Sequence, residues 1–502
     1  MRKLLLVAAV GLTLVTGCRK IEEDGQIVYL PGTGNGSGNG TGQTIVLRNT
    51  ITADSTLRKG NTYVLSGRVF IEKGITLTIE PGVTVKGEFS GENVAALIIK
   101  RGAKINARGT ASEPIIFTSN APTPKSGDWG GIVICGTARV NAAFNSISGL
   151  YSVEGGINDA TGRGLAGSGD ALYPTPNDDD NSGILQYARI EYAGYAFVPD
   201  NEINSLTLAA VGRGTTIDHV EVTYAKDDAF EWFGGTVNCK YLIAYKTQDD
   251  DFDTDNGYNG QVQFGLVVRD SSIADISKSE ALESDNNATG TAATPKTAPI
   301  FSNFTLIGPR AQLTNIGNSN YLGSAVQIRR NSALSLYNSV ILGWANGILI
   351  DAKDGQPTDA NFMSNDLRIK NVLIAGCNNA ISYTASTTQP TGADNASIAS
   401  WFNTQPSPFT NKTVSNGDDA RYTRPFDYGN YDFQPYGNSG SPIINFPSAT
   451  PAVVNNVDFS DSKLVAAIGS TSPNKIEIVT FRGAIAPAGD FANWYKGWTK
   501  FQ

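Results

Sequence analysis

The sequence predicts an all-β fold, a parallel β-helix in which short strands stack coil upon coil. The first observation is a repeated acidic phrase: residues 227–231 (DDAFE) recur as residues 249–253 (DDDFD), 22 positions later. A fixed offset of this length is typical of stacked structural repeats. The second is the alternation of apolar and polar residues before each phrase, which is strand periodicity. The third is composition, since 54 glycines and 17% charged residues suit a turn-rich β protein.

The strands that precede the two phrases also predict a register. Aligning their tyrosines pairs Tyr224 with Tyr245, an offset of 21, and Val222 with Ile243. We expect each pair to lie in adjacent coils of one sheet, about 4.8 Å apart. The acidic ends of the two phrases would then form one cluster at one edge of the solenoid.

The N-terminus has the features of an export signal. A short basic start is followed by an apolar run over residues 4–15, too short to span a membrane, which ends at Gly17 and Cys18. This ending resembles the lipobox of bacterial lipoproteins. The resemblance implies that residues 1–18 are a signal peptide with its lipobox cysteine, and that lipid is attached to Cys18 after cleavage before it. The alternative is an ordinary secretory signal beside a chance cysteine, which implies export without anchoring.

Residues 19–43 form a predicted flexible tether, because residues 31–42 are nearly all Gly, Ser, Thr and Asn. The charged residues 19–24 resemble the surface-export signals of some Gram-negative lipoproteins; the alternative is a solvated linker. The resemblance implies a protein of the cell outer membrane, anchored through Cys18 and facing the exterior.

The predicted β-helix occupies residues 44–445. Its first phrases, residues 65–87 and 96–109, show short alternating strands broken by glycine. They resemble the opening coils of right-handed parallel β-helices of the pectin-lyase-like type. Residues near 141–181 break the rhythm and predict an insertion at one edge. The aromatic residues 446–502 predict a C-terminal cap over the last coil, with a ligand platform as the alternative.

The acidic edge predicts a metal site. Five carboxylates fall within residues 249–255 and would repel one another unless a cation neutralises them. Calcium suits such a cluster because it takes six to eight oxygen ligands in loose geometry. The order Asp-Asp-x-Phe-Asp resembles the calcium site of pectate lyases of polysaccharide lyase family nine. That resemblance implies Asp249, Asp250 and Asp253 as ligands, joined by Asp228 or Asp227. The alternative is a solvated acidic turn.

The same resemblance argues against catalysis. Those lyases use the lysine of a Gly-Phe-Lys phrase one or two coils later, where this chain has acids at residues 279–287. Lys246 and Lys278 are the nearby candidates for a base. Glu231 and Asp253 would stack closely enough for paired-carboxylate glycoside hydrolysis, as would stacked acids on any solenoid edge. No catalytic residue is assigned.

Aromatic residues near the acidic edge are candidates for stacking on sugar rings: Tyr195, Trp232 and Tyr258. The alternative is a buried aromatic ladder. A formal net charge of −8 argues against nucleic-acid binding. His219 is the one histidine, which argues against zinc sites built on several histidines and against Ser-His-Asp triads.

These observations predict a lipid-anchored β-helix of the cell envelope that binds a glycan or a partner protein, such as an outer-membrane importer, without catalysis. The alternative is a calcium-dependent polysaccharide lyase or glycoside hydrolase that acts on an acidic polysaccharide. Fold alone does not decide between them, because this solenoid carries lyases, hydrolases, adhesins and passive stalks.

Overall fold

The computed structural model describes residues 28–30, 42–197, 202–310, 323–406, 409–435 and 457–501. The predicted signal peptide with Cys18 and most of the predicted tether lie outside the described residues. No helix within the described ranges is long and apolar enough to cross a membrane.

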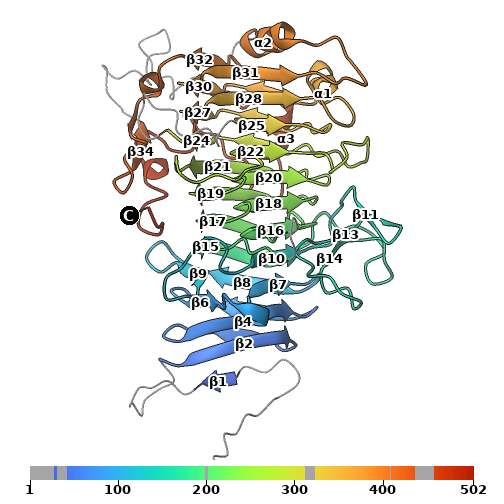
Figure 1. Ribbon diagram of the computed structural model, residues 1–502, viewed down its shortest axis with the longest axis vertical. Coiled ribbons are helices and arrows are strands. Elements are labelled where there is room, and N and C mark those ends of the chain that lie inside the picture. The colour runs from blue at the N-terminus through green and yellow to red at the C-terminus, as the bar shows by residue number, and fades with distance from the viewer. Residues whose placement is uncertain are drawn as a thin grey trace, which may run out of the picture.

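The described strands confirm the parallel β-helix (Figure 1). Strands of one sheet, sheet 1, carry the features that matter below. In stacking order they are the second half of β4 (Thr62–Ile71), β7 (Ala96–Ile99), β10 (Gly131–Cys135), β16 (Leu206–Ala209), β18 (Phe230–Phe233), β20 (Phe252–Asp255), β22 (Leu282–Ser284), β25 (Ser324–Ile328), β28 (Asn346–Asp351) and β31 (Asn379–Thr384).

Two further parallel sheets complete each coil. Sheet 2 holds β3 (Ser55–Leu57), β5 (Thr76–Ile79), β8 (Lys104–Arg108), the first halves of β15 (Gly183–Glu191), β17 (Thr216–Thr223), β19 (Cys239–Tyr245) and β21 (Gln261–Val268), then β23 (Ile300–Ser302), β26 (Ser335–Tyr337) and β29 (Arg368–Lys370). Sheet 3 holds the first part of β2 (Thr44–Ile51), the first half of β4, β6 (Thr84–Gly87), β9 (Ile115–Ser119), the second halves of β15, β17, β19 and β21, then β24 (Thr305–Ile307), β27 (Val340–Leu342), β30 (Leu373–Ala375) and β32 (Lys412–Val414). The last residues of β2 pair with the second half of β4 and so belong to sheet 1. At the N-terminal end β1 (Val28–Leu30) pairs antiparallel with β2.

The observed register corrects the predicted one by one residue. Strand β17 pairs with β19 at an offset of 22, which places Val222 opposite Ala244 and Glu221 opposite Ile243. The predicted pairing of Val222 with Ile243 is wrong, because a shift of one residue moves a side chain to the other face of a sheet. Val222 lies in the interior, whereas Ile243 packs outside against Tyr495 and Trp498. Tyr224 and Tyr245 lie in adjacent coils but are not register partners.

The corner between sheets 2 and 3 carries an aromatic ladder. Tyr187, His219, Tyr241 and Phe264 all have positive φ, between 47° and 64°. Their rings stack with centroids 4.2, 4.3 and 4.9 Å apart in that order. In each of these coils one residue with left-handed backbone conformation makes the turn at this corner, and its ring stacks on the equivalent ring of the next coil. His219, the lone histidine, is therefore one member of this ladder.

The predicted insertion folds over the outer face of sheet 1 (Figure 1). It contains two antiparallel hairpins, β11 (Ala143–Phe144) with β12 (Ile147–Ser148) and β13 (Leu150–Ser152) with β14 (Leu165–Gly167). Val153 and Ile157 of the insertion pack with Ile98 and Val133 of sheet 1 in one buried apolar cluster. This part of the sheet is consequently closed to solvent.

The last coil is covered by α2 (Asn395–Asn403), whose Ile398 and Phe402 join the core. The described C-terminal residues 457–501, which we call the strap, instead run back along the coils (Figure 1). Asp461, at the start of α3 (Ser462–Ile468), bonds Lys370 of β29 at 2.7 Å, and the backbone N–H of Lys500 donates to Glu221 of β17 at 2.8 Å. The predicted position of this segment over the last coil is therefore wrong; its aromatic residues cover the side of the solenoid.

Candidate functional site

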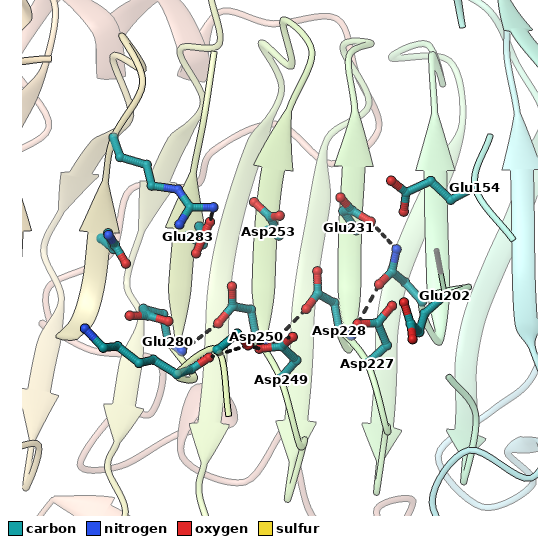
Figure 2. A pocket seen from close by; sticks show the side chains of 15 residues that line it. Glu154, Glu202, Asp227, Asp228, Glu231, Asp249, Asp250, Asp253, Glu280 and Glu283 are labelled. Carbon is teal, nitrogen blue, oxygen red and sulfur yellow. Dashed lines mark hydrogen bonds and ion pairs between the residues drawn. The ribbon is translucent and has the colours of Figure 1, made fainter. Parts of the chain in front are cut away.

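The repeated acidic phrases meet at the corner where each coil enters sheet 1. Phe230 pairs with Phe252, and Phe252 with Leu282, so these three side chains point into the core at successive coils. Because neighbouring side chains in a strand point to opposite faces, the residue after each one points outward. That alternation produces an outer row of Glu231, Asp253 and Glu283, and the turns before the strands contribute a parallel row of Asp228, Asp250 and Glu280 (Figure 2).

These rows line a cavity of about 260 Å³, which we call the acidic pocket. Five of its carboxylates, Asp228, Glu231, Asp250, Glu280 and Glu283, have at most 8% of their surface exposed. Among the described lining residues two side chains are cationic, Lys278 and Arg329, against ten carboxylates: Glu154, Glu202, Asp227, Asp228, Glu231, Asp249, Asp250, Asp253, Glu280 and Glu283. Arg329 is already paired with Glu283 and Asp285.

The pocket contains three groups of carboxylates whose oxygens lie within 4.8 Å of one another. They are Asp227, Asp228 and Asp249; Asp228, Glu231 and Asp253; and Asp250, Glu280 and Glu283. An ion that contacts oxygens at about 2.3–2.6 Å, as calcium does, can touch all three members of such a group at once. The donor set consists of oxygen alone, which suits a hard cation rather than zinc or copper.

Crowding and burial change the protonation of these acids. Burial first, and then the charges of Asp227 and Asp250, raise the pKa of Asp228 well above its usual range. Burial and the charges of Glu280 and Asp249 do the same for the pKa of Asp250. Burial is also the largest cause that raises the pKa of Asp249 to about 7. At neutral pH these groups can all be ionised only if a cation compensates their charge. Without a cation, some of them keep a proton.

Backbone groups of neighbouring coils orient the carboxylates. The N–H of Asp250 donates to Asp228 Oδ1 at 3.0 Å, and the N–H of Glu280 donates to Asp250 Oδ1 at 2.6 Å. Asp253 Oδ1 is buried and has no hydrogen-bond partner among the described residues. Asp228 and Asp250 are therefore each held by the backbone of the next coil, so the stacking of the coils orients these two acids.

A buried arginine supports the pocket from inside the solenoid. Arg269 and Asp251 form an ion pair at 3.1 Å, and neither side chain has any exposed surface. The guanidinium also donates to the backbone carbonyls of Thr247 at 2.6 Å, Asp249 at 2.5 Å and Glu280 at 3.0 Å. Arg269 therefore ties together the two turns that present the acids.

The structure brings all four predicted ligands, Asp228, Asp249, Asp250 and Asp253, to the acidic pocket. The aromatic prediction is wrong for Trp232 and Tyr258, which are fully buried and stack on each other at 5.4 Å, because a sugar can stack only on an exposed ring. Tyr195 is half-buried against Phe197 and does not line the pocket.

Of the two candidate bases, Lys278 lines the pocket. Lys246 begins the turn that carries Asp249 and Asp250, but it pairs with Asp270 at 3.1 Å and does not line the pocket. Sequence reasoning missed Glu154 and Glu202. Glu154 arrives from the insertion, and no local pattern connects it with sheet 1. Glu280 and Glu283 belong to the next coil, but Leu282 follows its partner Phe252 by 30 residues, and this longer coil conceals the 22-residue period.

Comparison with known families explains the extent of the fold. A sequence profile described as a pectate-lyase-like beta helix domain matches residues 49–419, which begins within β2 and ends near the last coil. No curated protein and no solved structure matches the chain. Since the matched region covers 371 of 502 residues and includes every strand of sheet 1, the chain belongs to the pectate-lyase-like beta helix domain family.

Proposed function

We propose that the acidic pocket binds calcium and that the protein uses the bound ion to hold a glycan at the cell envelope without cleaving it. The observation that carries this proposal is the convergence of ten carboxylates on one pocket with two cationic side chains among its described lining. Asp228, Asp249, Asp250 and Asp253 would hold the ion, with Glu231 and Glu280 adjacent. A bound cation supplies positive charge that can attract the carboxylates of an acidic glycan.

Calcium should stabilise the fold, because it removes repulsion that exists only when the pocket is formed. At one hundred times the dissociation constant the gain in free energy of unfolding is about 2.7 kcal/mol. We expect the melting temperature to rise with calcium and to fall on chelation. Asp250→Asn should melt lower than the parent protein in calcium and respond less to chelator.

The matched control for this experiment is Asp354→Asn, which removes one exposed carboxylate outside the pocket. This variant should respond to calcium as the parent protein does. Differential scanning calorimetry and isothermal titration calorimetry provide the measurements. Identical melting curves with calcium and with chelator, together with no heat of calcium binding, would contradict the proposal. The pocket would then be a solvated acidic surface.

A second candidate function is a calcium-dependent lyase or hydrolase, favoured by the position of Lys278 in the same pocket. As a base, Lys278 would take the proton from the ring carbon that bears a uronate carboxylate. The glycosidic C–O bond on the neighbouring carbon would break, a double bond would form between these two carbons, and the leaving oxygen would take a proton from water. However, its side chain is exposed and lacks the buried setting in which lysines act as bases. For hydrolysis, Glu231 and Asp253 are register partners on adjacent coils.

We therefore expect no ultraviolet-absorbing unsaturated product, and no new reducing ends, from acidic polysaccharides in calcium. A known pectate lyase serves as the positive control. If unsaturated product forms and Lys278→Met abolishes it while preserving calcium binding, the protein is a lyase. If new reducing ends appear and Glu231→Gln abolishes them, the protein is a hydrolase.

The location proposed from the sequence is the outer membrane, with the body held away from the surface by residues 19–43 and lipid on Cys18. Cys18→Ser should yield an uncleaved or soluble protein, because the thiol that accepts the lipid is absent. Membrane fractionation with a labelled fatty acid tests this. A Cys18→Ser protein that still carries the label in the outer membrane contradicts lipid attachment at this residue. The proposed ligand of the body, which faces away from the membrane, is a glycan. An outer-membrane importer is the alternative partner.

A further inference from the structure

A second cleft lies on sheet 1, on the N-terminal side of the insertion. It has a volume of about 660 Å³ and is lined by three arginines, Arg48, Arg68 and Arg163. We call it the arginine cleft. Two acids, Glu92 and Asp159, also line it, so the cleft carries a net positive charge in a protein whose formal charge is −8.

The arginine cleft and the acidic pocket lie along the same outer row of sheet 1. Phe70 in the arginine cleft pairs with Ile98, which pairs with Val133, then Thr207, and finally Glu231 in the acidic pocket. Four coil steps separate them, or about 19 Å. The insertion covers the row between them, and its residues Glu154 and Gly156 line the acidic pocket and the arginine cleft respectively. They are two separate sites on one face.

Two of the guanidinium groups are held in fixed orientations. Arg68 lies over the ring of Phe197 at 4.7 Å and donates to the carbonyl of Gly155 at 3.1 Å. Arg163 lies over the ring of Phe70 at 4.5 Å and donates to Asp159 at 2.7 Å. A planar guanidinium that already lies over an aromatic ring loses little freedom when it binds an anion.

These guanidiniums are close enough to repel each other. Burial first, and then the charge of Arg163, lower the pKa of Arg68. Arg48 is exposed at the same cleft and forms no ion pair within the described part of the chain. An anion between these groups would relieve the repulsion, and carboxylate and sulfate fit the guanidinium fork with two parallel hydrogen bonds.

The remaining polar lining suits hydroxyl groups. Asn49, Asn93 and Ser66 line the cleft, and the Ser66 hydroxyl donates to Asn93 Oδ1 at 3.3 Å. Amide groups both donate and accept hydrogen bonds, as the hydroxyls of a sugar require. We infer that the arginine cleft is a calcium-independent binding site for a saccharide that carries a carboxylate or sulfate group. This inference holds whether or not the acidic pocket binds calcium.

The test measures binding in the presence of EDTA, so that any contribution from the acidic pocket is removed. The probes are a tri-uronate, the same trisaccharide with its carboxyl groups reduced to alcohols, and a sulfated trisaccharide. We expect at least one anionic probe to bind at least about tenfold more tightly than the neutral one, because a hydrogen bond to a charged group contributes about 1.5–3 kcal/mol. Which anionic probe binds identifies the charged group.

Arg48→Ala should weaken that binding at least about tenfold, and since Arg48 is exposed the variant keeps the fold. Arg163→Gln provides a second variant on the insertion side. Arg108→Ala is the matched control, because it removes an exposed arginine from β8 on sheet 2. Asp250→Asn should leave EDTA-resistant binding unchanged. The inference is overturned if no anionic probe binds in EDTA, if the neutral probe binds equally well, or if the Arg48 and Arg163 variants bind like the parent protein.

Discussion

Replacing Arg269 with methionine should lower the free energy of unfolding by about 3–5 kcal/mol, because the carboxyl of Asp251 then lies unpaired in the interior, where it must either stay charged or take up a proton. Both side chains of this ion pair are fully buried. The variant also removes the donors to the carbonyls of Asp249 and Glu280, on the two turns that present the acidic pocket. We therefore expect weaker calcium binding as well as lower stability, although Arg269 does not line the pocket.

Denaturant titration and calcium calorimetry on the same samples separate the two effects. The double variant Arg269→Met with Asp251→Leu tests the cause, because it removes both charges at once. It should recover much of the lost stability, since two apolar residues can replace a buried ion pair, but should not recover calcium affinity. If Arg269→Met alone unfolds at the same denaturant concentration as the parent protein, the buried pair contributes nothing to stability.

Truncating Trp498 to alanine should cost about 3–5 kcal/mol, as expected for a fully buried tryptophan. Trp498 is 1% exposed, its ring meets Tyr187 and His219 edge-on at 5.7 Å each, and its carbonyl accepts from Arg189 at 3.2 Å. Its loss leaves a cavity against the aromatic ladder and loosens the end of the strap. Relative to the parent protein, amide hydrogen exchange in the Trp498→Ala variant should become faster in β15 and β17. It should change less in β25 and β28, which lie far from Trp498.

The control is Ile478→Ala, which truncates an apolar strap residue that is 68% exposed. Its effect should stay within about 0.5 kcal/mol, because it removes little buried surface. Equal losses in the two variants would mean that the strap contributes nothing specific to the aromatic ladder.

The sequence predicted the parallel β-helix along the whole solenoid, but it predicted which acids meet only where the coils are equal in length. Where the coils have 22 residues, the acidic phrase recurs at a constant offset. This offset predicts that Asp228 and Asp250 are neighbours, as they are in the structure. Aligning Tyr224 with Tyr245 because both are tyrosines gave an offset of 21 between the strands. The alternation of inward and outward side chains instead requires the observed offset of 22. Register follows burial, and burial required Val222 to face inward opposite Ala244.

Part of the site could not be predicted because its members come from distant segments. Glu154 reaches the acidic pocket from the insertion, and its position depends on the packing of Val153 and Ile157 against sheet 1. Trp232 was misassigned for a different reason. It lies one residue after an outward-facing acid, so alternation places it in the core, and its aromatic character alone suggested a surface role.

The strap has a consequence for how the nascent chain matures. Each coil needs only its predecessor, so the solenoid can assemble from the N-terminus as residues become available. The bond between Arg189 and Trp498, in contrast, joins residues 309 positions apart and forms only after Trp498 has been synthesised. A product truncated shortly before Trp494 would keep every strand of the three sheets but leave the aromatic ladder uncovered, and that exposed apolar strip would mark it as unfinished for proteases and chaperones.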